Sequence, residues 1–310
     1  MNFTLNILGT ASALPTVSRY PSAQVLDVRG RLFLIDCGEG AQMQMRRMGL
    51  SYLKVEVICL SHIHGDHLFG LSGLLSTMGL MGRKTPLTIF APRSFGPVLK
   101  FYLSYFGEGF RFPVEHHVLS MKEPEKVLDT KAVEMYAFPL NHRIETFGFL
   151  FREKEPQRNI RKDAIDKYGL GIAEMGRLKN GGDIVRPDGT VIANGDVTYR
   201  PYDPRSYAYC SDTAPFPELS GWVQGVDLLY HEATFPAGME EMAAATFHST
   251  TVQAAGCAAM AGVKRLIVGH YSSRVKDIRP LLDEMTPVFP KTMLAKEGDV
   301  IDIPLRRYHG

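Results

Sequence analysis

Three histidines and one aspartate lie within six consecutive residues, in the order H-x-H-x-D-H. His62 and His64 alternate along an extended segment, so both side chains can face one ion, whereas Asp66 and His67 lie beyond Gly65 and can face a second. Four polar side chains gathered in one short loop all need partners, and a divalent metal satisfies them together. This spacing is the strongest chemical pattern in the chain and predicts a metal site.

Further ligands must come from other parts of the chain, because one zinc ion takes three or four protein ligands. His142, Asp212 and His270 are the candidates, and each follows a largely apolar segment. Taken singly, each of the three is a weak candidate. Together with the loop at residues 62–67 they would complete a site for two ions.

Strand patterns explain how residues so far apart could meet. The apolar, β-branched run Val55–Leu60 ends just before His62, and three later strand patterns end just before polar groups. These patterns are Tyr207–Cys210 before Asp212, Val226–Tyr230 before His231 and Glu232, and Leu266–Val268 before His270. In α/β proteins, ligands collect beyond the carboxyl ends of the strands. We therefore expect an α/β fold with the site at one edge of its sheets.

The N-terminal part of the chain predicts the beginning of such a fold. Apolar residues alternate over Phe3–Ile7, and the segments Gln24–Val28 and Arg31–Ile35 flank a turn, which indicates a hairpin. The segment Ala41–Met48 consists of good helix formers and predicts a helix.

Composition excludes several classes of protein. The 310 residues are 45% hydrophobic and 22% charged, which excludes a disordered chain, a fibrous repeat and a small disulfide scaffold. The formal net charge is 35 − 33 = +2, so the overall charge neither predicts nor excludes binding to RNA. The four cysteines form no C-x-x-C pair, and we expect buried free thiols (Cys37, Cys59, Cys210 and Cys257).

No targeting or membrane segment is recognisable. The N-terminus lacks the basic start and long apolar block of a signal peptide. The longest uncharged stretch, residues 242–263, is rich in Ala, Thr, Ser, Gly and Gln and is too polar to span a membrane. We expect a cytoplasmic protein with no membrane association.

The segment at about residues 152–200 differs from its surroundings. It holds ten Lys or Arg, eight Asp or Glu and seven glycines, and Ala164–Tyr168 could form a short helix. We expect one domain over residues 1–310 with this segment as an inserted flexible arm. The insertion is either a solvated loop or an arm that grips a substrate.

The loop H-x-H-x-D-H after an apolar strand, followed later by His142, Asp212 and His270, resembles the metallo-β-lactamase superfamily. That resemblance implies an αββα sandwich with metals at one edge. The flavodiiron branch has a carboxylate at the position of His64 and performs redox chemistry, so His64 favours hydrolysis. The motifs that narrow the resemblance lie outside the loop.

The sequence is similar to the ribonuclease Z family, the tRNA 3′-processing endonucleases, in motifs that run in the right order from residue 4 to about 275. They are Leu8–Pro15, Asp36–Gly40, Ser61–Leu71, Ser211–Thr213, His231–Thr234, His248–Thr250 and Gly269–Arg274. Two of these motifs, His-Glu-Ala-Thr (His231–Thr234) and His-Ser-Thr (His248–Thr250), are far more specific for this family than the metal motif is. The protruding arm of many bacterial members carries a Gly-Pro motif, but residues 168–177 here contain no proline.

The resemblance implies two Zn²⁺ ions per chain and assigns their ligands. They are His62, His64 and His142 on one ion, Asp66, His67 and His270 on the other, and Asp212 between the two. Asp66 would also accept a proton from the attacking water, with pure ligation as the alternative.

The family's proton donor corresponds to His248 with Glu232 as its orienting carboxylate; structural roles are the alternative for both. Arg274 follows the last ligand closely and either contacts a phosphate or is an ordinary surface arginine.

We therefore expect an endoribonuclease that cleaves the 3′ trailer from precursor tRNA and leaves a 3′-hydroxyl on the tRNA. Family members usually act as homodimers in which the arm of one subunit holds tRNA for the active site of the other. Two other functions stay open: a small-molecule phosphodiesterase with the same metals, and a protein that binds tRNA without cleaving it.

Overall fold

The computed structural model describes residues 2–308, which fall into two compact units. The first, here called the sandwich unit, contains residues 2–152 and 206–303. The second, the inserted unit, contains residues 153–205 together with the C-terminal residues 304–308. The two units are described separately below.

The first sheet of the sandwich unit has seven strands and mixes antiparallel and parallel neighbours. Its order is β18 (Val300–Asp302), β1 (Phe3–Gly9), β2 (Ala23–Val28), β3 (Arg31–Cys37), β4 (Val55–Cys59), β5 (Leu87–Pro92) and β6 (Val114–Leu119). The strands β1, β2 and β3 form an antiparallel meander, whereas β3 to β6 run parallel. The predicted hairpin is β2–β3, in register from Val28 and Arg31.

The second sheet also has seven strands. Its order is β17 (Thr292–Leu294), β16 (Leu266–Gly269), β15 (Leu228–Glu232), β14 (Ser206–Cys210), β9 (Phe147–Glu153), β8 (Val133–Pro139) and β7 (Glu125–Asp129). The strands β14 to β17 are parallel, so their carboxyl ends reach the same edge of the sheet. This edge carries the polar groups that follow or end these strands.

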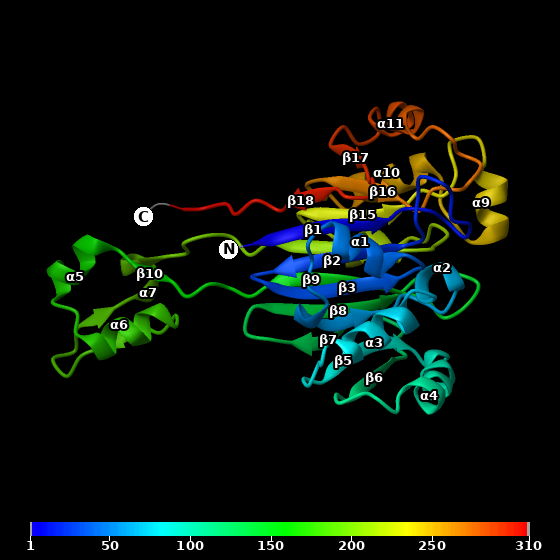
Figure 1. Ribbon diagram of the computed structural model, residues 1–310. Coiled ribbons are helices and arrows are strands. Elements are labelled where there is room, and N and C mark those ends of the chain that lie inside the picture. The colour runs from blue at the N-terminus through cyan, green and yellow to red at the C-terminus, as the bar shows by residue number, and fades with distance from the viewer. Residues whose placement is uncertain (1, 309–310) are drawn as a thin grey trace. The chain divides into compact units, whose positions relative to one another are not determined.

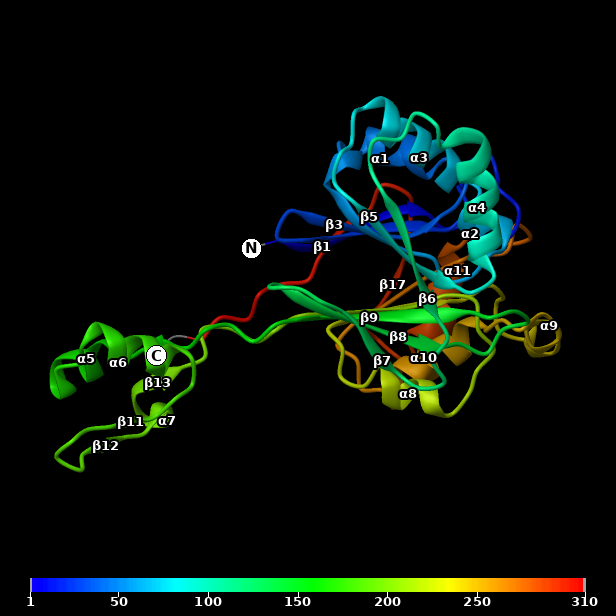
Figure 2. The same ribbon diagram turned by 90° about the horizontal axis from the view of Figure 1, so that it is seen from below.

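Helices cover the outer face of each sheet, and the two sheets face each other (Figures 1 and 2). The segments that connect β3 to β6 contain α1 (Ala41–Arg47), a 3-10 turn (Tyr52–Lys54), α2 (Gly65–Leu68), α3 (Leu71–Leu80) and α4 (Phe95–Phe106). The second half contributes α8 (Glu218–Trp222), α9 (Glu240–Thr246), α10 (Thr251–Met260) and α11 (Arg279–Met285). The expected αββα sandwich is confirmed.

Three apolar clusters correspond to the three interfaces of the sandwich. The central cluster joins residues of both sheets, among them Phe3, Phe33, Phe149 and Tyr209. The two outer clusters pack the first sheet against α1, α3 and α4, and the second sheet against α8, α10 and α11. The four cysteines are buried and unpaired, as expected.

The inserted unit has its own small core. It contains α5 (Lys162–Tyr168), α6 (Ile172–Lys179), α7 (Asn194–Val197) and two short ladders, β10 (Asn159–Ile160) with β13 (Thr198–Tyr199) and β11 (Ile184–Val185) with β12 (Val191–Ile192). Six buried apolar side chains hold these elements together: Ala164, Leu170, Leu178, Ile184, Ile192 and Val197. In residues 2–308, no helix is long and apolar enough to cross a membrane.

Candidate metal centre

Loops at strand ends carry the predicted ligands. His62 follows β4, His142 lies in the connection from β8 to β9, Asp212 follows β14 and His270 follows β16. The remaining three, His64, Asp66 and His67, lie in or next to the one-turn helix α2. The sequence analysis placed Glu232 after its strand, but β15 extends through this residue, so the strand itself fixes Glu232.

The ligand atoms form two groups. In the first, one atom each of His62, His64, His142 and Asp212 lies within 4.8 Å of the others. In the second, Asp66, His67 and His270 meet the same criterion. All seven residues that the sequence predicted as ligands therefore occur in these two groups. A third group, Asp212, His248 and His270, overlaps both and includes the predicted proton donor.

Asp212 lies between the groups and presents one oxygen to each. Its Oδ2 is 3.6 Å from His62 Nε2 and 3.9 Å from His142 Nε2. Its Oδ1 is 3.3 Å from His67 Nε2 and 3.1 Å from His270 Nε2. This arrangement suits a carboxylate that bridges two cations.

The donor set fits divalent cations. His62 Nε2 faces His64 Nδ1 at 2.9 Å, and His67 Nε2 faces His270 Nε2 at 3.3 Å. Two facing imidazole nitrogens can share one proton in a hydrogen bond, but they clash if both are protonated and their lone pairs repel if neither is. A cation between them removes the conflict, and nitrogen and carboxylate oxygen are ligands for several transition metals, zinc included.

Burial and neighbouring charges act differently on the individual ligands. Burial would lower the pKa of His67, but the carboxylates of Asp212, Asp66 and Asp36 outweigh it and raise that pKa well above its ordinary value, so bound metal would have to displace a proton from this ring. Burial lowers the pKa of His62, and positive charge on His67 lowers it further, so this ring stays neutral. Burial alone would raise the pKa of Asp66, but the charge of His67 and the close imidazoles of His67 and His270 outweigh it and hold the pKa well below its usual range. Asp66 is therefore ionised at neutral pH.

Hydrogen bonds behind the ligands fix their orientation. The buried carboxylate of Asp36 accepts from His67 Nδ1 at 2.8 Å, and the backbone carbonyl of Phe247 accepts from His142 Nδ1 at 2.9 Å. A neutral ring that donates from Nδ1 presents its Nε2 lone pair to the metal position, as each of these rings would with a cation bound. The Ala13 N–H donates to Asp66 Oδ2 at 2.7 Å.

Two glycines allow the loops to approach the centre. A Cβ on Gly38 would lie 2.3 Å from the backbone oxygen of Asp66, so the loop after β3 can pack against α2 only with glycine there. A Cβ on Gly269 would lie 2.3 Å from the hydroxyl of Tyr230, and the following residue, His270, has a φ of 62°. The lack of a side chain at Gly38 and Gly269 thus allows both ligand loops to pack where they do.

The predicted proton-donor pair lies beside the ligands. His248 Nδ1 is 2.8 Å from Glu232 Oε1, and Glu232 is fully buried. Burial would lower the pKa of His248, but the Glu232 carboxylate outweighs that effect and raises it to about 9. His248 therefore carries a proton at neutral pH.

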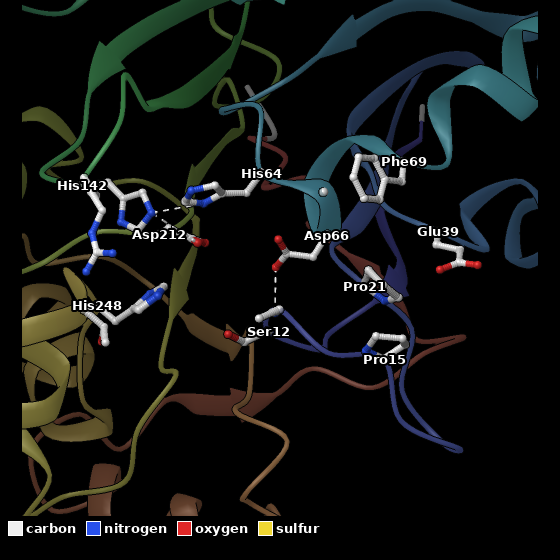
Figure 3. A pocket seen from close by; sticks show the side chains of 14 residues that line it. Ser12, Pro15, Pro21, Glu39, His64, Asp66, Phe69, His142, Asp212 and His248 are labelled. Carbon is white, nitrogen blue, oxygen red and sulfur yellow. Dashed lines mark hydrogen bonds and ion pairs between the residues drawn. The ribbon is translucent and has the colours of Figure 1, made fainter.

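These groups open onto a cleft of about 590 Å³ in the sandwich unit. Figure 3 shows His64, His142, Asp212, Asp66 and His248 directed into it. Arg143, which the sequence analysis did not select, also lines the cleft. Arg274 is not among the lining residues; its guanidinium contacts the sulfur of Met242 at 2.8 Å.

Asp36 and Thr234 also escaped the sequence analysis as individual site residues, although both lie in motifs that it quoted. Asp36 contacts His67 across 31 positions of sequence, and Thr234 contacts His270 across 36. Only their membership of the motifs could have drawn attention to them.

Two face-to-face sheets, helices on both outer sides and a cluster of His and Asp at one edge define a metallo-β-lactamase-fold protein with a divalent-metal site. The sequence is 45% identical over 302 residues to ribonuclease Z of Bacteroides thetaiotaomicron, covering 97% of this chain and 95% of that protein. It is 41% identical over 310 residues to ribonuclease Z of Cytophaga hutchinsonii, covering 100% and 99%. The chain belongs to the ribonuclease Z family.

Solved structures agree with this assignment. Human tRNase Z, short form, superimposes with a TM-score of 0.72 at 25% identity, covering 97% of this chain and 99% of that one. The metallo-β-lactamase fold protein YhfI from Bacillus subtilis gives a TM-score of 0.69 at 15% identity, covering 97% and 100%, which shows the shared fold. A family profile described as anti-Pycsar protein Apyc1 matches residues 3–104.

Proposed function

We propose that this protein is a zinc-dependent endoribonuclease that removes the 3′ trailer of precursor tRNA and leaves a 3′-hydroxyl on the tRNA. The observation that carries the proposal is the position of the His248–Glu232 pair beside the two ligand groups, because cleavage of a phosphodiester needs both an activated water and a proton for the leaving oxygen. Relatives named ribonuclease Z match nearly the whole chain.

Two Zn²⁺ ions are the cofactors we propose. His62, His64 and His142 would hold one, Asp66, His67 and His270 the other, and Asp212 would bridge them. When bound, the ions would supply Lewis acidity and lower the pKa of water. Four of the seven ligands are buried, which keeps water away from them: His62, His67, Asp212 and His270.

The chain's own side chains would move the protons. Ionised Asp66 would accept the proton of the attacking water as well as bind metal. Protonated His248, held by Glu232, would donate to the leaving 3′-oxygen. Arg143, at the wall of the cleft, is a better candidate for a phosphate contact than Arg274, which lies outside it.

We propose that the inserted unit contacts tRNA. Exposed basic side chains on its helices support this function: Lys162, Lys167, Arg177 and Lys179. Contacts to phosphates make binding weaken as salt concentration rises.

We also propose a homodimer. A groove between α3 and α4 is lined by apolar side chains, and its rim exposes Phe69 (73%), Phe101 (62%) and Phe106 (59%). Large exposed apolar patches on a folded protein mark interaction sites. Sedimentation of the wild type and of Phe101→Glu tests this, since a monomeric wild type would refute the homodimer. We place the enzyme in the cytoplasm, where reducing conditions suit four free thiols.

The decisive experiment incubates zinc-loaded protein with a 3′-extended precursor tRNA beside Asp66→Ala and maps the product ends. We expect one cut at the end of the mature tRNA, absent in the variant. Hydrolysis of bis(p-nitrophenyl) phosphate without that cut would favour a small-molecule phosphodiesterase. Binding of tRNA with hydrolysis of neither substrate would favour a binding protein.

A further inference from the structure

The hydroxyl of Thr234 lies between a metal-ligand histidine and the carboxylate of the proton-donor pair. Its Oγ1 is 2.6 Å from Glu232 Oε2 and 2.8 Å from His270 Nδ1, with a longer contact of 3.4 Å to His248 Nδ1. All three side chains are buried, with exposed fractions of at most 2%. No water can therefore replace either contact without a rearrangement.

The two short contacts leave one arrangement for this hydroxyl, since His248 Nδ1 already has a closer acceptor in Glu232 Oε1. A hydroxyl has one proton, and the short contact with a carboxylate oxygen requires that Thr234 donate it to Glu232. Thr234 Oγ1 must then accept from His270 Nδ1–H. With its proton on Nδ1, His270 presents a lone pair on Nε2, the atom that faces Asp212 at 3.1 Å and Asp66 at 3.5 Å.

Glu232 is held at four points. Its Oε2 accepts from the backbone N–H and hydroxyl of Thr234, and its Oε1 accepts from the Thr213 N–H and from His248. A carboxylate bound in this way has no freedom to rotate. The orientation of His248 therefore depends on Thr234 as well as on Glu232.

We propose that Thr234 is a positioning residue that couples the second ligand group to the proton donor: one hydroxyl sets the tautomer of His270 and the orientation of the Glu232–His248 pair. This inference rests on the roles proposed above for His270 and His248. It adds that metal binding and leaving-group protonation share a single hydrogen-bonded chain.

The experiment compares Thr234→Val, which keeps the shape but loses the hydroxyl, with Thr234→Ser, which keeps the hydroxyl. Thr292→Val is the matched control, because Thr292, at the start of β17, is also buried and its hydroxyl donates to the backbone carbonyl of Phe289 in the preceding turn. Circular dichroism and thermal melting establish that each variant is folded.

Two readouts separate the two halves of the proposal. Competition with a chromophoric chelator measures zinc affinity, which we expect Thr234→Val to lower about tenfold, as loss of a hydrogen bond behind a ligand usually does. The second readout is the ratio of kcat values for precursor tRNA and bis(p-nitrophenyl) phosphate under saturating zinc. Nitrophenolate leaves without protonation, so Thr234→Val should lower the ratio about tenfold or more.

Thr234→Ser should restore both quantities to near the wild-type values, and Thr292→Val should change neither. Wild-type zinc affinity together with a wild-type ratio in Thr234→Val would overturn the proposal. Equal damage in Thr234→Ser and Thr234→Val would also overturn it, because the methyl group and not the hydroxyl would then matter. If the wild type fails to cut precursor tRNA, the proposed function fails, while zinc affinity still decides whether Thr234 orients His270.

Discussion

Asp36 lies behind the second ligand group with no exposed surface. Its carboxylate accepts hydrogen bonds from the Ser61 N–H and hydroxyl, from Tyr209 and from His67, all at 2.7–2.8 Å. Every neighbour is a donor, so an amide in its place would direct its own N–H groups at other donors. Asp36 thus links the stability of the fold to the orientation of His67, a proposed metal ligand.

We predict that Asp36→Asn lowers the free energy of unfolding by about 2–4 kcal/mol, because buried donors lose a charged acceptor. Zinc affinity should fall about 10–100-fold as His67 loses its orienting partner. Urea unfolding and chelator competition measure these effects. Asp27→Asn is the control, because Asp27 is a half-buried residue of β2, and its Oδ1 accepts from the Gly30 N–H in the following turn. A variant with unchanged zinc affinity would contradict the proposed orientation of His67.

Glu232 controls the proton of His248, which gives a pH prediction. The carboxylate raises the pKa of His248 to about 9 against the opposing effect of burial. Because a proton donor must be protonated, cleavage of precursor tRNA should decline as pH rises through the pKa of His248. In Glu232→Gln that pKa should move down toward the ordinary value of 6.5.

The alkaline limb of the pH–kcat profile should therefore lie at lower pH in Glu232→Gln than in the wild type. Single-turnover cleavage at several pH values, with zinc saturating, measures it. Hydrolysis of bis(p-nitrophenyl) phosphate should lack the shift because its leaving group needs no proton. An alkaline limb at the same pH in both proteins would remove His248 from the role of proton donor.

Among the elements, the strands of the sandwich were the most predictable from the sequence. Period-two alternation and apolar runs predicted β1, β2, β3, β4, β14 and β16 with ends that differ by at most two residues from those observed. The strand β15 begins and ends two residues later than predicted, because His231 and Glu232 continue its pairing with Val268 and Gly269. Local pattern could not reveal that pairing.

The residues of the candidate site also divide into those that could be predicted from the sequence and those that could not. The loop at residues 62–67 was predictable because its ligands are neighbours in sequence. Asp36 and Thr234 were not, because one contacts its histidine from the end of β3 and the other from just after β15. Such contacts depend on how the sheets bring strands together, which residue spacing does not encode.

An internal ion pair closes the inserted segment at its two ends. Arg205, the last residue of the segment 153–205, binds Glu153, the first, through Nε at 2.8 Å and Nη2 at 2.9 Å. Both side chains are almost fully buried. The backbone N–H of Glu153 also donates to the carbonyl of Arg205 at 2.8 Å.

We predict that Glu153→Gln destabilises the protein by about 3–5 kcal/mol, because the charged Glu153 carboxylate that accepts from the buried guanidinium of Arg205 becomes a neutral amide. The double variant Glu153→Gln, Arg205→Met should be less destabilised than the sum of the single variants. Urea unfolding of all four proteins gives the coupling energy. Additive effects would mean that the two charges do not depend on each other.

At the scale of the whole molecule, two compact units divide the proposed tasks. The sandwich unit contains all proposed ligands and the proton-donor pair, whereas the inserted unit contains a separate small core and exposed basic residues. Chemistry and tRNA binding should therefore be separable by mutation. If the protein is a homodimer, the two tasks can even be assigned to different subunits.

Mixing two inactive variants tests that division of labour. One lacks the inserted segment between its ion-paired ends, with a short Gly-Ser linker, and keeps its metal centre; the other is Asp66→Ala and keeps the segment. Random mixing makes half of the dimers heterodimers. If the inserted unit of one subunit binds tRNA for the cleft of the other, each heterodimer has one working cleft out of two. Activity on precursor tRNA should then return to about a quarter of the wild-type value.

The deletion variant alone should still hydrolyse bis(p-nitrophenyl) phosphate, which shows that its metal centre has folded. Phe101→Glu introduced into both chains should abolish the recovery, because charge at the rim of the apolar groove would keep the subunits apart. Mixed dimers that form but never cut precursor tRNA would instead require each inserted unit to act on the cleft of its own chain.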